Sequence, residues 1–273
     1  MSSAPLDVGF LSSLSYRCYD LGVLPLYDVM VLDINCAYAW SAPVSTTLLP
    51  FWRAHFSDNH LDIGVGSGFF PSTVLGDAES ADQKLTIWDL STTALAKTKR
   101  RVEMAAPHVV VQTIEADATA LPASVDTSRK FDSISASLLL HCIPMSPEEK
   151  MRGLVATARQ LLSPTGVFYG TTVLGDTARK ITVPSATIDW LPGGETSFGI
   201  SGEAKVATGL NLFGWAVMSF YNRAGIFTNW EDKPDVFVEA LEEGFEIVDS
   251  WVIGQVLVFR ARGPRAEVEG SSE

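Results

Sequence analysis

The chain changes from a strand to a helix at Leu61-Asp62-Ile63-Gly64-Val65-Gly66-Ser67-Gly68. Glycine lets a backbone turn tightly and approach a bound molecule at a distance that a β-carbon would prevent. The spacing is G-x-G-x-G, whereas the dinucleotide fingerprint has its third glycine three residues after the second, where this chain has Phe69. The segment predicts a ligand-binding turn, with a glycine-rich turn that binds nothing as the alternative.

Short apolar runs surround this turn and are typical of strands buried on both faces of a parallel sheet. They are Leu61–Val65, Leu85–Trp88, Val109–Ile114, Phe131–Ser137 and Gly166–Leu174. Helices are predicted between them, one capped by Ser91 and one that begins with the capping box Ser146-Pro147-Glu148-Glu149 and carries Leu162 on its apolar face. Strand and helix alternate, as in a doubly wound α/β sheet.

The C-terminal part departs from this alternation. Phe245–Val252 and Gln255–Ala261 read as strands separated by little more than Ile253-Gly254. So short a connection permits an antiparallel hairpin and excludes a parallel crossover. We therefore expect an α/β fold with a doubly wound, mostly parallel seven-stranded sheet that ends in an antiparallel hairpin.

Changes in the pattern of apolar and polar residues along the chain predict its domain organisation. The expected parts are an N-terminal helical lid or substrate region (1–58), a cofactor-binding α/β core (59–175), an irregular insertion that covers the substrate (176–210), C-terminal helices with the closing hairpin (211–262) and a flexible tail (263–273). In the helix predicted over Leu212 to Arg223, the stripe of Trp215, Met218 and Phe220 favours core packing over a pocket.

Three acids follow three successive predicted strands, where open α/β sheets bind ligands. Asp62 precedes the glycines and suits a cationic ligand, such as one with a sulfonium and an ammonium group. Asp89 lies 21 residues after Gly68, near the spacing at which an acid accepts hydrogen bonds from a ribose diol. Asp117 follows the third run and suits an exocyclic amine of adenine. An ordinary solvated loop acid is the alternative for Asp117.

Charge and composition argue against several kinds of binding partner and site. The chain has 20 Lys+Arg against 32 Asp+Glu, a net charge of −12, so we expect no nucleic-acid partner and no membrane partner. No metal site is predicted, because His55, His60 and His108 lack a second ligand at useful spacing. The N-terminal segment lacks a positive region and no uninterrupted apolar run is long enough to span a membrane, so we expect a cytoplasmic protein.

These residues together resemble the class I S-adenosylmethionine-dependent methyltransferases, from about residue 27 to residue 261. The matching parts are Asp62–Gly68, Asp89, Asp117 and Phe131–Ser137. The chain is more narrowly similar to small microbial and fungal natural-product methyltransferases in its Tyr-Asp-x-x-Val-Leu, Tyr-x-Trp and Leu-Leu-His-Cys-Ile-Pro elements and in Asn222–Asn229.

The resemblance implies S-adenosyl-L-methionine as cofactor and S-adenosyl-L-homocysteine as product. Asp62 and Gly64 would face the methionine end, Asp89 the ribose, Leu90 the adenine ring, and Asp117 with Ala118 its edge. The implied cofactor set is Tyr27, Tyr38, Trp40, Asp62, Gly64, Val65, Gly66, Gly68, Asp89, Leu90, Asp117, Ala118 and Ser137. The three aromatic residues of this set act as a lid over the cofactor in one interpretation and as simple helix packing in the other.

The resemblance leaves the methyl acceptor open. We expect a small, moderately apolar metabolite of specialised metabolism with an oxygen or nitrogen acceptor, and a possible homodimer. His141 is the candidate catalytic base, with a structural histidine as the alternative. Competing functions are a pericyclase-like or cyclase-like enzyme that binds the cofactor, and a non-catalytic partner subunit. A nicotinamide oxidoreductase is disfavoured by Phe69 and by the hairpin.

Overall fold

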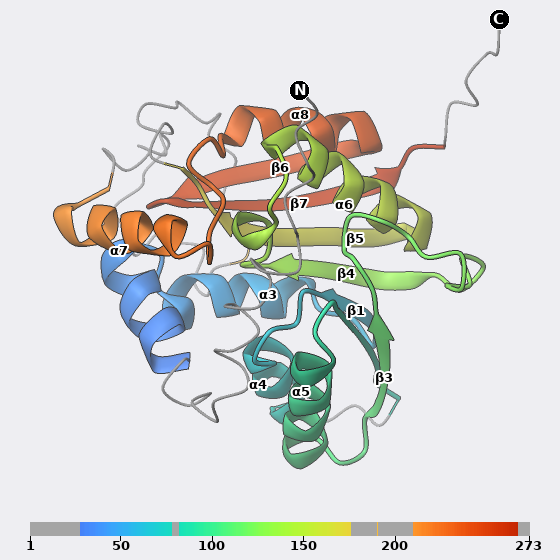
Figure 1. The fold of residues 1–273 in the computed structure, drawn as a ribbon. Helices are drawn as coiled ribbons and strands as arrows, with labels where there is room; N and C mark the ends of the chain where they lie inside the picture. The colour runs from blue at the N-terminus through green and yellow to red at the C-terminus, as the bar shows by residue number, and fades with distance from the viewer. Residues whose placement is uncertain (1–27, 78–81, 176–189, 191–209, 267–273) are drawn as a thin grey trace, which may run out of the picture.

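The computed structural model describes residues 28–77, 82–175, 190 and 210–266, and they form an α/β fold around one sheet (Figure 1). The strand order is β3-β2-β1-β4-β5-β7-β6. The strands are β1 (Asn59–Ile63), β2 (Lys84–Asp89), β3 (Val110–Glu115), β4 (Phe131–Ser137), β5 (Leu162–Val173), β6 (Phe245–Ile253) and β7 (Val256–Pro264). The first five pair in parallel, and β7 pairs antiparallel with both β5 and β6. The predicted fold class is confirmed.

Helices cover both faces of the sheet. They are α3 (Leu49–His55), α4 (Phe69–Gly76), α5 (Thr92–Ala105), α6 (Pro147–Leu161), α7 (Leu212–Arg223) and α8 (Pro234–Gly244), with the irregular helices η1 (Asp28–Ala39), η2 (Val44–Leu48) and η3 (Leu140–Cys142). Figure 1 shows α6 and α8 side by side on one face of the sheet. The opposite face packs against η1, α3 and α7 through an apolar cluster that includes Trp52, Tyr169 and Met218.

Local hydrogen bonds explain why the two predicted helices begin where they do. The Ser91 side chain accepts from the backbone N–H of Ala94 and caps α5. Ser146 and Glu149 form the expected capping box at the start of α6. The end of α6 differs from the prediction, because the helix stops at Leu161 and Leu162 already pairs with Phe131 as the first residue of β5.

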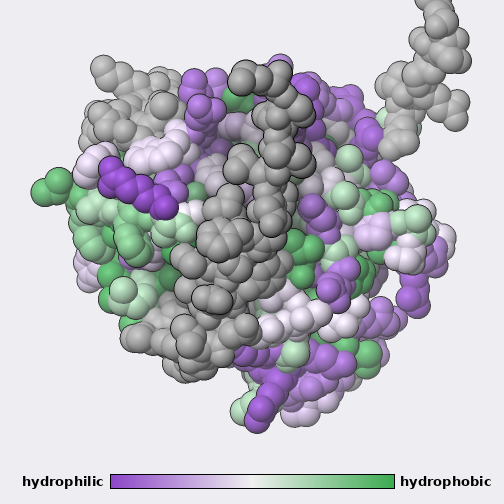
Figure 2. Space-filling model, viewed as in Figure 1, coloured by the Kyte–Doolittle hydropathy of each residue, from purple (hydrophilic) through white to green (hydrophobic). Residues whose placement is uncertain are grey.

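Helix α7 has the predicted bounds, but the packing prediction is wrong for two of its three large side chains. Met218 is fully buried, whereas Trp215 is 44% exposed and Phe220 is 62% exposed. Leu212 and Phe213 are exposed as well. Figure 2 shows hydrophobic residues gathered on the face where α7 lies in Figure 1.

Parts of the predicted organisation lie outside the described residues, namely residues 1–27 of the N-terminal region, most of the segment 176–210, and residues 267–273 of the tail. The domain boundaries stay predictions. Among the residues that the structure describes, no helix is both long enough and apolar enough to cross a bilayer.

Candidate active site

The glycine turn connects β1 to α4 in the conformation that the sequence pattern predicts. Gly64, Gly66 and Gly68 all have positive φ angles, of 73°, 53° and 71°, which L-residues with side chains rarely adopt. A β-carbon on Gly64 would also lie 2.5 Å from a methyl carbon of Leu139. The turn therefore requires glycine for its backbone angles and for its close packing against the segment after β4.

Asp62 is the penultimate residue of β1, close to this turn, and is only 4% exposed. The hydroxyl of Ser135 donates a hydrogen bond of 2.6 Å to its Oδ1 atom. Burial raises the pKa of Asp62 to about 7, with the negative charge of Asp89 adding to the rise and the Ser135 hydrogen bond opposing it. A nearby cation would stabilise the charged form of such a buried carboxyl. Asp62 therefore suits a positively charged group of a ligand.

Asp89 ends β2, the strand next to β1, and connects two parts of the site. Its Oδ2 accepts from the N–H of Gly66 at 3.2 Å, and its Oδ1 accepts from the N–H of Ser91 at 2.8 Å. Burial raises the pKa of Asp89, and these backbone hydrogen bonds oppose that rise. A carboxylate has about four lone-pair sites, so Asp89 retains acceptor capacity for hydroxyl groups of a ligand.

The remaining predicted cofactor residues after β2 and β3 are accessible. Leu90 is 56% exposed. Asp117 is exposed and accepts from the backbone N–H and the hydroxyl of Thr119 at 2.8 and 2.7 Å. Ala118 is half-buried beside it. Asp62 near the end of β1, Asp89 at the end of β2 and Asp117 just after β3 thus lie at the carboxyl ends of three neighbouring strands.

The segment after β4 contains a backbone feature that sequence reasoning missed. Ser137, a predicted cofactor residue, ends β4 and is half-buried, and the next residue, Leu138, has a positive φ of 54°. Such an angle costs a non-glycine residue roughly 1–3 kcal/mol. The N–H of Leu138 donates to the carbonyl of Thr171 at 2.7 Å, which holds the turn. A leucine there carries no sequence signal for this conformation, since glycine and asparagine usually adopt it.

His141 lies in η3 and is 4% exposed. The backbone N–H of Val173 donates to its Nδ1 atom at 3.3 Å, and Thr172 Oγ1 lies at the same distance from Nδ1. Burial lowers the pKa of His141 to about 3, and the positive charge of Lys150 adds to the effect. The ring is therefore neutral at pH 7, and because Nδ1 accepts a hydrogen bond, its proton is on Nε2.

The predicted aromatic lid divides into three different environments. Tyr27 lies outside the described residues, Tyr38 is 68% exposed, and Trp40 is 2% exposed. The Trp40 ring lies 6.1 Å from the ring of Phe227, which packs edge-on against His141 at 4.3 Å. The structure thus links Trp40 to the turn that carries His141.

A buried ion pair beneath this turn is a second feature that the sequence analysis missed. Lys150 of α6 is fully buried, and its Nζ atom lies 2.7 Å from Oδ1 of Asp232, which is also fully buried. The Nζ atom also donates to the carbonyl of Thr228 at 3.3 Å. The N–H of Thr228 donates to the carbonyl of His141 at 2.8 Å. The ion pair therefore anchors the loop that supports His141.

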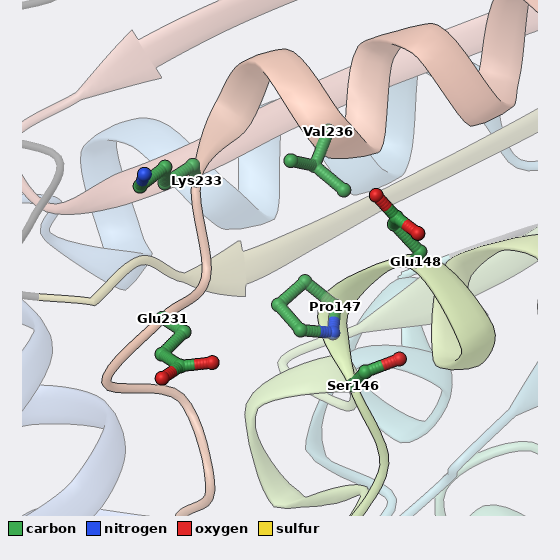
Figure 3. Close-up of a pocket in the computed structure, with 6 residues that line it drawn as sticks. All are labelled: Ser146, Pro147, Glu148, Glu231, Lys233 and Val236. Atoms are coloured by element: carbon green, nitrogen blue, oxygen red, sulfur yellow. The ribbon is translucent and has the colours of Figure 1, made fainter.

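The structure also contains a cavity of about 430 Å³ where the amino-terminal ends of α6 and α8 meet (Figure 3). It is lined by Ser146, Pro147, Glu148, Glu231, Lys233 and Val236. None of the predicted cofactor residues lines it, and its mixed charges match no single ligand class. Among the described residues, no group of three or more His, Cys, Asp or Glu side chains is arranged to hold a metal ion.

Comparisons with known proteins show the family to which the chain belongs. A family model described as "Methyltransferase domain" matches residues 61–168. O-methyltransferase NEC2 of Pyricularia oryzae is 35% identical over 271 residues, and the alignment covers 90% of each chain. The physcion biosynthesis cluster O-methyltransferase of Aspergillus chevalieri is 34% identical, with 90% of this chain and 94% of the relative covered.

Among solved structures, the DhpI–SAH complex matches 96% of this chain and 100% of its own length, with a TM-score of 0.54 at 14% identity. This likeness shows the shared fold, including the antiparallel strands at the C-terminal end. The sequence relatives cover nearly the whole chain at more than 30% identity. The chain therefore belongs to the class I S-adenosylmethionine-dependent methyltransferase family and is a methyltransferase.

Proposed function

We propose that this chain binds S-adenosylmethionine and transfers its methyl group to an oxygen of a small, moderately apolar metabolite in secondary metabolism. The observation that carries the proposal is Asp62, a buried carboxyl with a raised pKa beside a turn of three positive-φ glycines. Oxygen as the acceptor atom is supported by two relatives that are named as O-methyltransferases. The net charge of −12 supports a small-molecule acceptor over a nucleic acid.

The residues present fit the cofactor. Asp62 would hold the cationic methionine end, Asp89 the ribose hydroxyls and Asp117 the adenine edge. The backbone of the glycine turn could come close to the cofactor, because glycine has no β-carbon. When bound, S-adenosylmethionine supplies an activated methyl group on a sulfonium. The enzyme's main task is then to align the two reactants and exclude water, since in-line displacement gains most from orientation. Tyr38 and Trp40 stay proposed covers of this site.

His141 has a proposed catalytic role that its hydrogen bonds redefine. A neutral ring whose Nδ1 accepts from Val173 carries its proton on Nε2, so Nε2 acts as a donor. A fixed donor would stabilise an acceptor oxygen that has released its proton to solvent as a phenolate, and would orient it toward the methyl group. We propose that His141 orients the acceptor oxygen in this way, in place of the general-base role suggested by histidine's usual pKa.

Thermal unfolding with added S-adenosylhomocysteine tests cofactor binding. At one hundred times the dissociation constant, bound ligand stabilises the fold by about 2.7 kcal/mol, which corresponds to a rise in Tm of about 5–10 °C. Asp89→Ala should abolish the rise. Asp126→Ala is the matched control, because the Asp126 carboxylate accepts from the exposed Ser128 and is not one of the proposed cofactor residues. The binding proposal fails if millimolar S-adenosylmethionine and S-adenosylhomocysteine both leave the wild-type Tm unchanged.

Methyl transfer itself is tested with methyl-labelled S-adenosylmethionine and a panel of phenols, followed by mass spectrometry. His141→Gln and His141→Ala separate the possible roles of His141. Glutamine places an N–H near the Nε2 position and retains the donor, so His141→Gln should keep most turnover while His141→Ala loses it. A general base would instead be lost in both variants, and a purely structural histidine would change stability without this split.

A further inference from the structure

A row of buried polar side chains lies on the face of the sheet that α3 covers, where apolar residues would be expected. His60 and Asp62 alternate with Leu61 along β1, so they point to the same face. The register pairs His60 with Ser133 and Asp62 with Ser135 of β4. His60, Ser133 and Ser135 have no exposed surface at all.

These side chains form a continuous hydrogen-bonded chain that ends at Asp62. His60 Nε2 lies 2.9 Å from Ser135 Oγ, and Ser135 donates to Asp62 at 2.6 Å. On the other side of the ring, His60 Nδ1 lies 2.6 Å from Ser133 Oγ. Ser133 in turn accepts from the backbone N–H of Ser57 at 3.0 Å.

Donor counting assigns a direction to every bond in this chain. Ser135 has one hydroxyl proton and gives it to the Asp62 carboxylate, so it accepts from Nε2–H of His60. A neutral His60 then has a free lone pair on Nδ1, which accepts from the Ser133 hydroxyl. Burial lowers the pKa of His60 to about 3, so the ring is neutral at pH 7. All the hydrogen bonds consequently point toward Asp62.

Tight packing keeps the imidazole in this orientation. The Trp52 ring of α3 lies 5.0 Å from the His60 ring, and the ring of Phe56 lies 4.8 Å from it. Tyr169 of β5 lies on the same side, with its ring 6.0 Å away. A serine hydroxyl rotates freely in isolation, but the Ser135 oxygen accepts from the fixed Nε2–H group and also interacts with the Tyr169 hydroxyl. Its proton is thereby directed to the carboxylate.

We propose that His60 is a positioning residue for cofactor binding, which acts through Ser135 to hold Asp62 in the charged, oriented form that receives the cationic methionine end of the cofactor. The inference rests on the proposed function for the identity of the ligand. The hydrogen-bonded chain itself is independent of that identity.

A matched pair of substitutions tests the role of each ring nitrogen. His60→Gln places its amide nitrogen near the Nε2 position and keeps a donor for Ser135. His60→Asn has the shorter side chain, which keeps a partner for Ser133 and loses the donor to Ser135. His55→Asn is the control for replacing a buried histidine in the same layer, because the His55 ring contacts the Phe51 carbonyl and Arg260 and is not a member of the hydrogen-bonded chain that ends at Asp62.

Calorimetric binding of S-adenosylhomocysteine at pH 8 is the first measurement. We expect His60→Asn to weaken binding by up to about tenfold, the upper end for one lost hydrogen bond between neutral groups. His60→Gln should stay within about threefold of wild type by the same reasoning, and His55→Asn should match wild type. In a Ser135→Ala background, His60→Asn should add nothing further, because the two residues act in series.

Carbon-detected NMR titration of the Asp62 carboxyl in the ligand-free protein is the second measurement, assigned by comparison with Asp62→Asn. His60→Asn should raise the Asp62 midpoint by about one pH unit, and His60→Gln should not. Asp89 and Tyr169 also act on Asp62, and they are present in all the variants compared. This readout requires no ligand.

The outcomes are distinguishable. If wild type binds no S-adenosylhomocysteine, the proposed function is wrong, while the carboxyl titration still decides whether His60 controls Asp62. His60 would be only structural if His60→Asn and His60→Gln changed cofactor affinity and the Asp62 midpoint equally. The same conclusion would follow if His60→Asn kept its full effect in the Ser135→Ala background. If His60→Asn does not fold, Ser135→Ala must raise the Asp62 midpoint, and an unchanged midpoint would overturn the proposal.

Discussion

Replacing Lys150 by methionine should destabilise the fold strongly through a contact that lies outside the cofactor site. Methionine fills a volume similar to that of the lysine stem but leaves the Asp232 carboxyl without its ammonium partner. The pair has no access to solvent, with side-chain exposures of 0% and 1%. Breaking a buried pair from one side costs about 3–5 kcal/mol, because the remaining charge is buried without compensation.

The stability lost in Lys150→Met should increase with pH. Burial already raises the pKa of Asp232 to about 6, with the positive charge of Lys150 opposing the rise. The folded state thus binds this proton more tightly than the unfolded state, so the stability from this group is present below about pH 4 and decreases as pH rises toward 6. Without Lys150 the pKa rises further, and the penalty should grow between pH 6 and pH 8 by up to about 1.4 kcal/mol per pH unit.

Urea unfolding at pH 6 and pH 8, followed by circular dichroism, measures both quantities. Lys150→Met should lose about 3–5 kcal/mol at pH 8, or about 6–20 °C in Tm. Arg152→Met is the control on the same helix, because Arg152 pairs with Glu243 at the surface, with exposures of 54% and 51%. An exposed pair contributes about 0–1 kcal/mol. The reasoning is refuted if the two variants differ by less than about 1 kcal/mol at pH 8, or if the Lys150→Met penalty is independent of pH.

Three further predictions concern the turn, its acid and α7. Gly64→Ala should lower the free energy of unfolding by about 2–4 kcal/mol in urea. The φ angle of Gly64 is positive, and the new β-carbon would lie 2.5 Å from a side-chain carbon of Leu139. Gly76→Ala is the control and should cost under about 1 kcal/mol, because the atom nearest to its new β-carbon lies 3.5 Å away. Affinity for S-adenosylhomocysteine should rise with pH up to about 7 and then level off as Asp62 ionises, and calorimetry between about pH 5.5 and 8.5 should show a flat profile for Asp62→Asn. Met218→Ala should lower the free energy of unfolding by about 2–5 kcal/mol, and Trp215→Ala should lower it by less, because of these two residues only Met218 is fully buried. Equal losses of stability would contradict the exposure of Trp215.

The sheet was predictable because its central strands β1, β2, β4 and β5 are largely buried and lie in short apolar runs of sequence. The bounds predicted for Phe131–Ser137 are those of β4, and the short Ile253-Gly254 connection correctly predicts the final hairpin. Local chemistry predicts the helix starts equally well, since a capping box such as that of Ser146 acts within four residues. Sequence alone carries this information because each signal depends on near neighbours in the chain.

The features that the sequence did not reveal depend on contacts between distant segments. His60 and Ser135 become partners only through the register of β1 against β4. Lys150 reads as an ordinary exposed helix residue until Asp232 is brought against it. Trp215 reads as core because hydrophobicity alone does not say which face of α7 the remainder of the fold covers. Period-two alternation of polar residues in both strands was the available signal for the His60 network.

The position of β7 has a consequence for the order in which the polypeptide acquires its structure. The last strand in the sequence lies between β5 and β6 in space, so β6 is attached to the sheet only through β7. Until residues 256–264 have been synthesised, β5 has an unpaired edge and β6 has no strand partner. Exposed edges of this kind invite association with other chains. A nascent chain released before Val256 should therefore be a client of chaperones, and the closing hairpin completes the sheet.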